Sequence, residues 1–159
     1  MTQPLPHNLA EMINAANASG WAGDTGIHVL SASRDEVTAE LTVTPRHCQP
    51  YGIVHGGVHA GVIETLASIG AAIAAGFDGR SVVGLENHTS FLRAVRGGKL
   101  LAKATPITRG RRSQVWEVAV RDEAGKLCST GRVRLLVLEA GAELAGEQPV
   151  IGGLPSADR

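Results

Sequence analysis

The chain has 159 residues, no formal net charge at neutral pH and two cysteines, and 43% of its residues are hydrophobic. This length suffices for one domain with its own core. Zero net charge gives no bulk attraction to nucleic acid or to an acidic membrane surface. Two cysteines are too few for a disulfide framework, and the first residues lack the basic and apolar regions of a secretory signal. We therefore expect a single cytoplasmic domain with free thiols and with no nucleic-acid or membrane partner.

The first third of the chain predicts one short helix and two strands. Asn8 is a suitable helix N-cap, Glu11 follows it at the capping-box spacing, and the helix is expected to end near Ser19. Residues 26–33 are apolar enough for a strand. In residues 37–44, apolar side chains alternate with threonine and glutamate, which is typical of a half-buried antiparallel strand.

A long apolar stretch follows, and it predicts the central helix. From Gly57 to Phe77 the chain contains no proline, lysine or arginine, and alanine and branched apolar residues dominate. One apolar stripe recurs every three or four residues and consists of Val58, Val62, Leu66, Ile69 and Ile73. Another face carries small residues together with Glu64 and Ser68. Because the stretch contains Glu64, His59 and several glycines, we expect a buried core helix and not a membrane span.

The second half of the chain predicts four strands separated by tight turns. A turn at residues 77–80 leads into the expected strands at 81–95, 100–108, 113–121 and 127–139. Because the connections are short, we expect these strands to form an antiparallel meander. The whole pattern indicates an α+β domain in which the helix lies across a curved antiparallel sheet. We divide the chain into an N-terminal helical segment, a main domain and a flexible tail, at residues 1–25, 26–139 and 140–159.

Glu64 is the strongest candidate for a catalytic group. A carboxylate among apolar and small residues is costly to bury without a partner, and such groups are frequently functional. The alternative is that Glu64 lies at the rim of the helix and meets solvent or an arginine. Ser68 follows at i+4, where its hydroxyl can hydrogen-bond Glu64 or hold a water, or where it simply packs as a small residue.

The start of the helix is a candidate electrophile site. Backbone N–H groups in the first turn lack intrahelical partners, and the glycines Gly56 and Gly57 allow a carbonyl oxygen to approach them as in an oxyanion hole. The alternative is an ordinary tight turn. Gly56 and Glu64 are eight residues apart, or about 12 Å along a helix axis, so one small carbonyl group cannot contact both. If both are catalytic, two antiparallel copies of the helix in a two-fold dimer must share the site.

The helix start and the loop before it resemble a known family. The stretch from Gln49 to Gly57 (Gln-Pro-Tyr-Gly-Ile-Val-His-Gly-Gly), followed by Glu64 and Ser68, is similar to the signature of hotdog-fold acyl-CoA thioesterases. The group that it resembles most is the phenylacetate-pathway type, which includes 4-hydroxybenzoyl-CoA thioesterases with a catalytic glutamate and the enterobactin proofreading thioesterase. The resemblance runs from about Gly26 to Glu139.

This resemblance implies the hotdog fold and a role for several residues. Glu64 would be the base or nucleophile, the Gly56 N–H would polarise the thioester carbonyl, and Gln49, His55 and Ser68 would lie around it. Residues on two segments would border the coenzyme A arm of the substrate, namely Val83, Gly84, Glu86, Phe91, Arg109, Gly110, Arg111, Arg112 and Ser113. Guanidinium groups suit phosphate oxygens, although a basic hairpin is often only solvated. Close relatives have a histidine where this chain has Phe91, which changes the pocket wall.

Two other interpretations are open. His55 and His59 have the i, i+4 spacing of two metal ligands, but the glutamate of a His-Glu-x-x-His motif is absent, so we expect no metal. A hotdog protein can also bind acyl-CoA without catalysis, although Glu64 argues against a pure binder. The sequence thus predicts an acyl-CoA thioesterase without a cofactor, assembled as a homodimer, two of which form a homotetramer.

Overall fold

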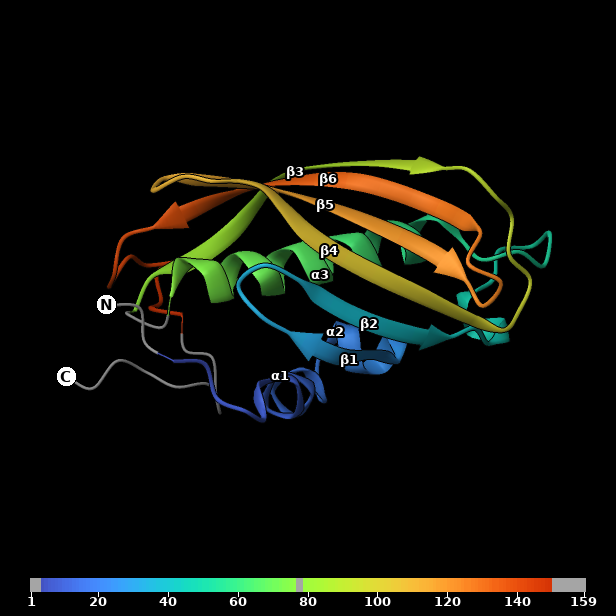
Figure 1. Ribbon diagram of the computed structural model, residues 1–159, viewed down its shortest axis with the longest axis horizontal. Helices are drawn as coiled ribbons and strands as arrows, with labels where there is room; N and C mark the ends of the chain where they lie inside the picture. Colours follow the sequence, from blue (N-terminus) through green and yellow to red (C-terminus); the bar gives the residue numbers. More distant parts are fainter. Residues whose placement is uncertain (1–3, 77–78, 150–159) are drawn as a thin grey trace.

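In the computed structural model, which describes residues 4–76 and 79–149, one long helix lies against a curved six-stranded sheet (Figure 1). The helix is α3 (Gly56–Ala75). The strands are β1 (Ile27–Ala32), β2 (Val37–Thr42), β3 (Ser81–Phe91), β4 (Lys99–Arg109), β5 (Ser113–Asp122) and β6 (Leu127–Leu138). Every strand pair is antiparallel, and the order across the sheet is β1-β2-β4-β5-β6-β3. This arrangement is the hotdog fold, as predicted.

The helix α3 forms the core because almost every side of it is apolar. Ile63, Leu66 and Ala67 are fully buried under the sheet. By length and composition α3 could cross a membrane, but half of its most apolar stretch is already buried within this domain, as expected of a core helix. The helix ends at Gly76, whose φ of 93° lies in the left-handed region that glycine adopts readily.

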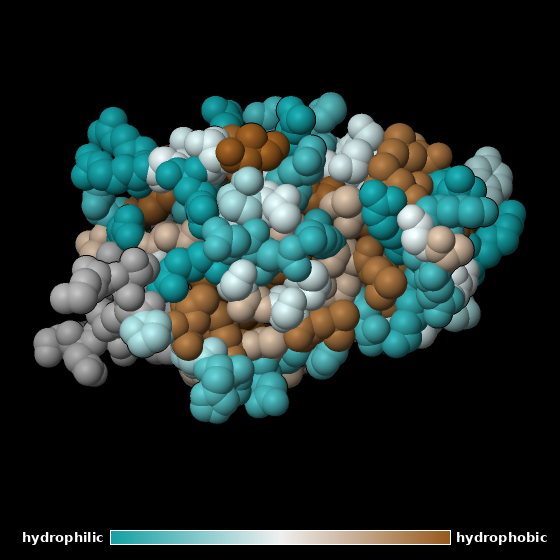
Figure 2. Space-filling view, in the orientation of Figure 1, coloured by the Kyte–Doolittle hydropathy of each residue, from teal (hydrophilic) through white to brown (hydrophobic). Residues whose placement is uncertain are grey.

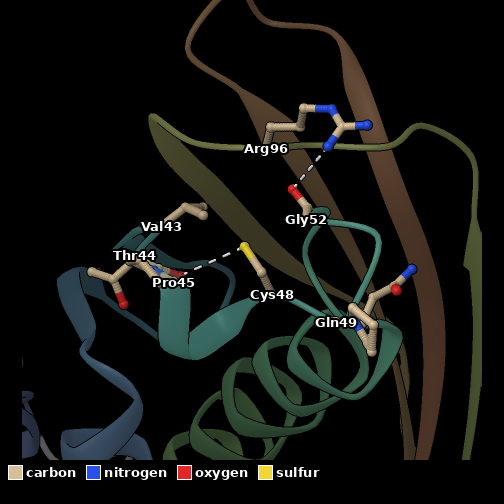
Figure 3. A pocket seen from close by; sticks show the side chains of 8 residues that line it. Val43, Thr44, Pro45, Cys48, Gln49, Gly52 and Arg96 are labelled. Atoms are coloured by element: carbon tan, nitrogen blue, oxygen red, sulfur yellow. Dashed lines mark hydrogen bonds between the residues drawn. The ribbon is translucent and has the colours of Figure 1, made fainter.

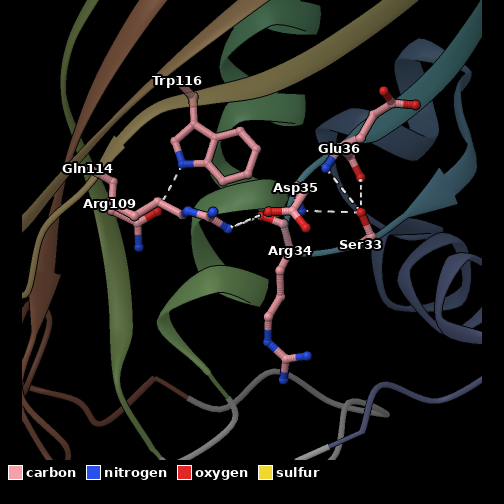
Figure 4. Close-up of polar contacts among 7 residues, drawn as sticks. All are labelled: Ser33, Arg34, Asp35, Glu36, Arg109, Gln114 and Trp116. Carbon is pink, nitrogen blue, oxygen red and sulfur yellow. Dashed lines mark hydrogen bonds and ion pairs between the residues drawn. The ribbon is translucent and has the colours of Figure 1, made fainter. Parts of the chain in front are cut away.

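Close packing of α3 on β5 depends on a glycine and a buried tryptophan. A Cβ added to Gly70 would lie 2.5 Å from the indole of Trp116, which is fully buried. The indole Nε1 donates to Gln114 Oε1 (2.9 Å), and Gln114 Nε2 donates to the Ala71 carbonyl (3.1 Å) (Figure 4). The buried amide of Gln114 thus ties the strand to the helix and satisfies the indole N–H.

The expected meander is wrong at its first connection. β3 does not pair with β4; it lies at the edge of the sheet beside β6, and β4 lies between β2 and β5. Residues 92–98 carry the chain across the intervening strands. Three strand spacings amount to about 14 Å, and seven extended residues can span about 23 Å, so a short connection does not force neighbouring strands to pair.

The predicted strand at 81–95 is also too long. β3 ends at Phe91 because the next two amides, of Leu92 and Arg93, both turn to the carbonyl of Cys128 (2.9 and 3.0 Å). The other predicted strands agree with the structure to within two residues. Of the predicted turn at 77–80, Phe77 and Asp78 lie outside the described residues.

The N-terminal segment contains two helices where one was predicted. α1 (Leu9–Asn17) is followed by the short α2 (Trp21–Thr25), which ends at Gly26 with a φ of 82°. Asn14 joins α1 to the sheet, because its side chain donates to the Val29 carbonyl (2.9 Å) and accepts from the Val29 amide (2.8 Å). In the expected flexible tail, residues 150–159 lie outside the described part, and an isolated bridge joins Leu144 to Glu147.

The surface mixes hydrophobic and hydrophilic side chains. On the face shown in Figure 2, brown apolar areas are separated by teal polar areas, in keeping with the neutral net charge. Several large apolar side chains are nevertheless exposed on or just after β3, namely Leu85, Phe91 and Leu92. Because β3 is an edge strand, these side chains lie beside a row of backbone groups that can accept a further strand.

Candidate active site

The loop before α3 is held in shape by short local hydrogen bonds. A short 3₁₀ helix (Pro45–His47) is followed by a bridge between Cys48 and Val54. Gln49 begins a turn in which its side-chain Oε1 accepts from the Tyr51 amide (2.9 Å). This loop also borders a cavity of about 540 Å³ (Figure 3), which is lined by Val43, Thr44, Pro45, Cys48, Gln49, Pro50, Gly52 and Arg96.

At the N-terminus of α3, one backbone N–H finds no acceptor among the residues that the structure describes. His55 is the N-cap, and its Nδ1 accepts from the Gly57 amide (2.8 Å), while its carbonyl accepts from the Val58 amide (2.9 Å). Within residues 4–76 and 79–149, nothing accepts from the Gly56 N–H. Because His55 Nδ1 acts as an acceptor, a proton on the neutral ring resides on Nε2. The helix start therefore keeps the Gly56 N–H available to a ligand.

Phe91 lies directly over this helix start. A Cβ added to Gly56 would come within 3.0 Å of the Phe91 ring. The ring also lies beside His59, with 6.3 Å between the two ring centroids. Phe91 therefore forms one wall next to the candidate electrophile site, on the face of β3 that looks toward α3. His88 lies on the opposite face, since it pairs with the exposed Arg132, and it cannot substitute for a polar side chain at position 91.

The carboxylate of Glu64 is half-buried between α3 and β3. Its Oε2 accepts from Asn87 Nδ2 (2.9 Å), and its Oε1 is 3.4 Å from the Ser68 hydroxyl. The backbone of Gly84 packs against the Glu64 carboxylate, because a Cβ added to Gly84 would be 2.5 Å from Glu64 Oε1. The predicted pair of Glu64 and Ser68 is thus brought together, and Gly84, predicted to border coenzyme A, borders the carboxylate.

A bulge in β3 brings Gly84 and Asn87 to the same side of the strand. Residues three apart in a regular strand point to opposite faces. Here Gly84 pairs with Leu135 and Glu86 pairs with Arg134, so Leu85 is an extra residue. Asn87 consequently pairs with buried Val133, and Gly84 with buried Leu135, on the face toward α3.

Sequence reasoning missed Asn87 and its neighbour Thr89. The Thr89 hydroxyl donates to Asn87 Oδ1 (2.7 Å), so the two side chains form a chain of hydrogen bonds that ends on Glu64. The available signal was their i, i+2 spacing in a strand expected to pack on the helix. The bulge that selects their face has no comparable signature in the sequence.

Glu64 and Gly56 are not brought together within one chain. They lie on the same helix, about 12 Å apart along its axis by the helical rise. A single thioester carbonyl cannot contact both, as the spacing predicted. The described residues also contain no group of three His, Cys, Asp or Glu side chains that could hold a metal ion.

The basic hairpin between β4 and β5 is partly occupied by contacts within the protein. Arg109 pairs with Asp35 (2.8 Å) and donates to the Arg34 carbonyl (2.8 Å), which fastens the hairpin to the β1–β2 turn (Figure 4). Arg111 lies 3.5 Å from Glu139, with both side chains exposed. Within the described part of the chain, the guanidinium of Arg112 meets no partner.

Of the other predicted coenzyme A residues, Val83, Glu86 and Ser113 lie on the outer face of the sheet, whereas Gly84 and Phe91 face α3. Ser113 on β5 and Val83 on β3 both pair with Leu136 on β6, the strand between them. Ser113, at the base of the hairpin, is therefore two strand spacings, or about 10 Å, from Val83. Glu86 lies 3.5 Å from Arg134 on the outer face. Gly110 forms the turn, its amide donating to the Ser113 carbonyl (2.8 Å).

His59 is a buried polar group on the first turns of α3. Its Nδ1 lies 2.9 Å from the hydroxyl of Ser129, which is fully buried. Burial lowers the pKa of His59 below its ordinary value of 6.5, since the charged imidazolium loses hydration there. The spacing of His55 and His59 therefore reflects a helix cap and a neutral, buried side chain.

Comparison with known proteins agrees with this geometry. Residues 51–129 match the thioesterase superfamily. The chain is 35% identical over 132 residues to the proofreading thioesterase EntH of Cronobacter turicensis, covering 83% of this chain and 96% of that protein. The chain belongs to the thioesterase superfamily.

Solved structures of superfamily members share the fold. The crystal structure of thioesterase HI1161 from Haemophilus influenzae has a TM-score of 0.81 at 33% identity and covers 89% of this chain and 96% of its own. A variant of thioesterase PA1618 from Pseudomonas aeruginosa has a TM-score of 0.80 at 27% identity and covers 86% of this chain and 97% of its own. Fold and family membership thus place the chain among the thioester hydrolases.

Proposed function

We propose that the protein is an acyl-CoA thioesterase that hydrolyses an aryl- or fatty-acyl-CoA to the free acid and coenzyme A. The observation that carries this proposal is the Glu64 carboxylate, held by hydrogen bonds on the core helix of a thioesterase-superfamily protein. The second support is the Gly56 N–H, which has no acceptor among the described residues and points out of a helix N-terminus.

The chemistry follows from these two groups. Water adds to the thioester carbonyl, and the oxygen that gains negative charge is stabilised by the Gly56 N–H. Glu64 takes the proton of the attacking water as a general base; alternatively it attacks the carbonyl itself and gives an anhydride that water then cleaves. The carbon–sulfur bond breaks, and the coenzyme A thiolate leaves and is protonated. Both routes consume only water, so we propose that the enzyme uses no cofactor.

A two-fold dimer would bring Glu64 close to a Gly56 N–H. Two antiparallel copies of α3 would set the Gly56 amide of one protomer opposite Glu64 of the other. The edge strand β3 supports this assembly, because it carries exposed Leu85 and Phe91, with exposed Leu92 just after it, beside Asn87 and Gly84, which contact the site. We propose an obligate homodimer, assembled further into a tetramer, in the cytoplasm.

The substrate's phosphates are assigned to the basic hairpin. Arg109 is engaged by Asp35 and the Arg34 carbonyl, so the exposed Arg111 and Arg112 are the better candidates for phosphate contacts. Arg111 would exchange its long contact with Glu139 for the ligand. Ser113 begins β5 at this hairpin and Val83 lies on β3, with β6 between them, and Phe91 would contact the acyl group near the carbonyl.

A panel of aryl- and fatty-acyl-CoA thioesters tests the proposal, with release of free thiol as the readout. The wild-type protein should turn over at least one class, and Glu64→Gln should lose activity while keeping its fold. A protein that binds the thioesters without releasing thiol would instead be an acyl-CoA binding module, and undiminished turnover by Glu64→Gln would remove Glu64 from the mechanism.

A further inference from the structure

The Glu64 carboxylate is anchored from β3 by an amide whose orientation is fixed. Asn87 Nδ2 donates to Glu64 Oε2 (2.9 Å) and to the carbonyl oxygen of Ala60 (3.1 Å). A backbone carbonyl can only accept, and an ionised carboxylate can only accept, so the NH₂ end of the amide must face α3. Thr89 then donates to the Oδ1 end (2.7 Å). All three contacts agree on one orientation of the Asn87 side chain.

This anchoring restricts a side chain that would otherwise be mobile. A glutamate has three rotatable side-chain bonds, and ordering such a side chain costs conformational entropy. Asn87 holds Oε2, so Oε1 is the oxygen left for chemistry; its protein contact is the long one from Ser68, at 3.4 Å. Gly84 leaves the space that Oε1 occupies, because any side chain there would collide with it.

We propose that Asn87 and Thr89 are positioning residues for the hydrolysis, with Asn87 aiming the free oxygen of Glu64 and Thr89 fixing the Asn87 amide. This inference rests on the proposed function of Glu64. Correct placement of a reacting group contributes strongly to the rate, and a hydrogen bond that operates on the reacting carboxylate lowers the barrier without contacting coenzyme A. Loss of either residue should therefore lower kcat and leave KM nearly unchanged.

The test measures steady-state kinetics of single and double variants on one acyl-CoA. Asn87→Ala should lower kcat on the order of 10-fold or more, the range for a hydrogen bond to a charged group. Thr89→Val should lower it less, by about 3- to 10-fold, and Thr89→Ser, which keeps the hydroxyl, should restore it. If Asn87→Ala does not fold, the comparison of Thr89→Val with Thr89→Ser still tests the proposal, because these variants change only the hydrogen bond from Thr89 to Asn87.

A coupling measurement separates positioning from a general structural role. In a Glu64→Gln background, Asn87→Ala should cause little further loss, because residues that act as a unit are strongly non-additive. Asn14→Ala is the matched control. Asn14 also bridges two backbone groups, on β1, and its loss should lower the melting temperature without a selective effect on kcat.

The outcomes distinguish this inference from the proposed function. If Glu64→Gln is inactive while Asn87→Ala and Thr89→Val keep the wild-type kcat, positioning by β3 is refuted and Glu64 stays catalytic. An equal fold loss from Asn87→Ala with and without Glu64 would also refute it, since Asn87 would then act elsewhere. If Glu64→Gln retains full activity, the proposed function itself is wrong.

Discussion

A mixture of two inactive variants provides the most direct test of a site shared between protomers. Glu64→Gln removes the base or nucleophile, and we expect kcat to fall by at least about 10²-fold. Gly56→Val places a branched side chain where even a Cβ would lie 3.0 Å from the Phe91 ring. Phe91 is 59% exposed in the single chain, so the variant should fold, and recovery of the mixed dimer verifies that it still assembles. Its N–H would be covered, and the loss of an oxyanion donor costs about 10²–10³-fold in kcat.

The expected recovery follows from the separation of the two residues on α3. If both residues act on one thioester, their separation of about 12 Å along the helix axis requires each site to take Glu64 from one protomer and Gly56 from the other. A mixed dimer then has one site with both defects and one site with neither. Random exchange of equal amounts makes about half of the dimers mixed, so total activity should reach about one quarter of the wild-type value. Each parent alone should show about one hundredth or less.

The assay uses two affinity tags, one on each variant, and tandem purification of the mixed dimer after subunit exchange. Purified mixed dimers should have about half of the wild-type activity per dimer. A mixture of Glu64→Gln with Glu64→Ala is the control and should recover nothing. Verified mixed dimers of Glu64→Gln and Gly56→Val that stay inactive would refute the shared site. Glu64 would then have to work with an electrophile-binding group of its own chain.

Three further predictions concern substrate binding and stability. Replacing both Arg111 and Arg112 by alanine should raise KM for acyl-CoA more than it lowers kcat. The effect should shrink with a pantetheine thioester or at high salt. An equal response to acyl-CoA and to the pantetheine thioester would contradict the phosphate assignment. Gly70→Ala should lower the free energy of unfolding, measured by urea denaturation, by about 1–3 kcal/mol, because the added methyl overpacks against Trp116. Gly97→Ala is the control: a Cβ there meets nothing within 4 Å, so the free energy of unfolding should change by less than about 0.5 kcal/mol. Burial lowers the pKa of His59 below 6.5, so at mildly acidic pH the unfolded chain binds a proton at this side chain that the folded protein does not bind. The free energy of unfolding should therefore fall as the pH drops from about 7 to about 5. His59→Gln should flatten that slope, and an unchanged slope would contradict the assignment.

The sequence alone determined the elements whose physics is local. The central helix was predicted from a long run without proline or basic residues, and it extends from Gly56 to Ala75. The strand periodicities and the turns at glycines placed β2, β4, β5 and β6 to within two residues. The candidate pair of Glu64 and Ser68 followed from an i, i+4 spacing on that helix and was brought together. These features depend on neighbours a few residues away, which is why a single sequence displays them.

Only the tertiary structure decided where β3 lies and what it presents to the helix. A seven-residue connection is long enough to reach either a neighbouring strand or the far edge of the sheet, so chain order could not reveal that β3 pairs with β6. The extra residue at Leu85 turns Gly84 and Asn87 to the same face, and the position of that bulge is set by pairing with a strand more than forty residues later. The sequence therefore identified the carboxylate, because its cost of burial is a local property. The amide that holds it depends on non-local register, and it became visible only in the folded protein.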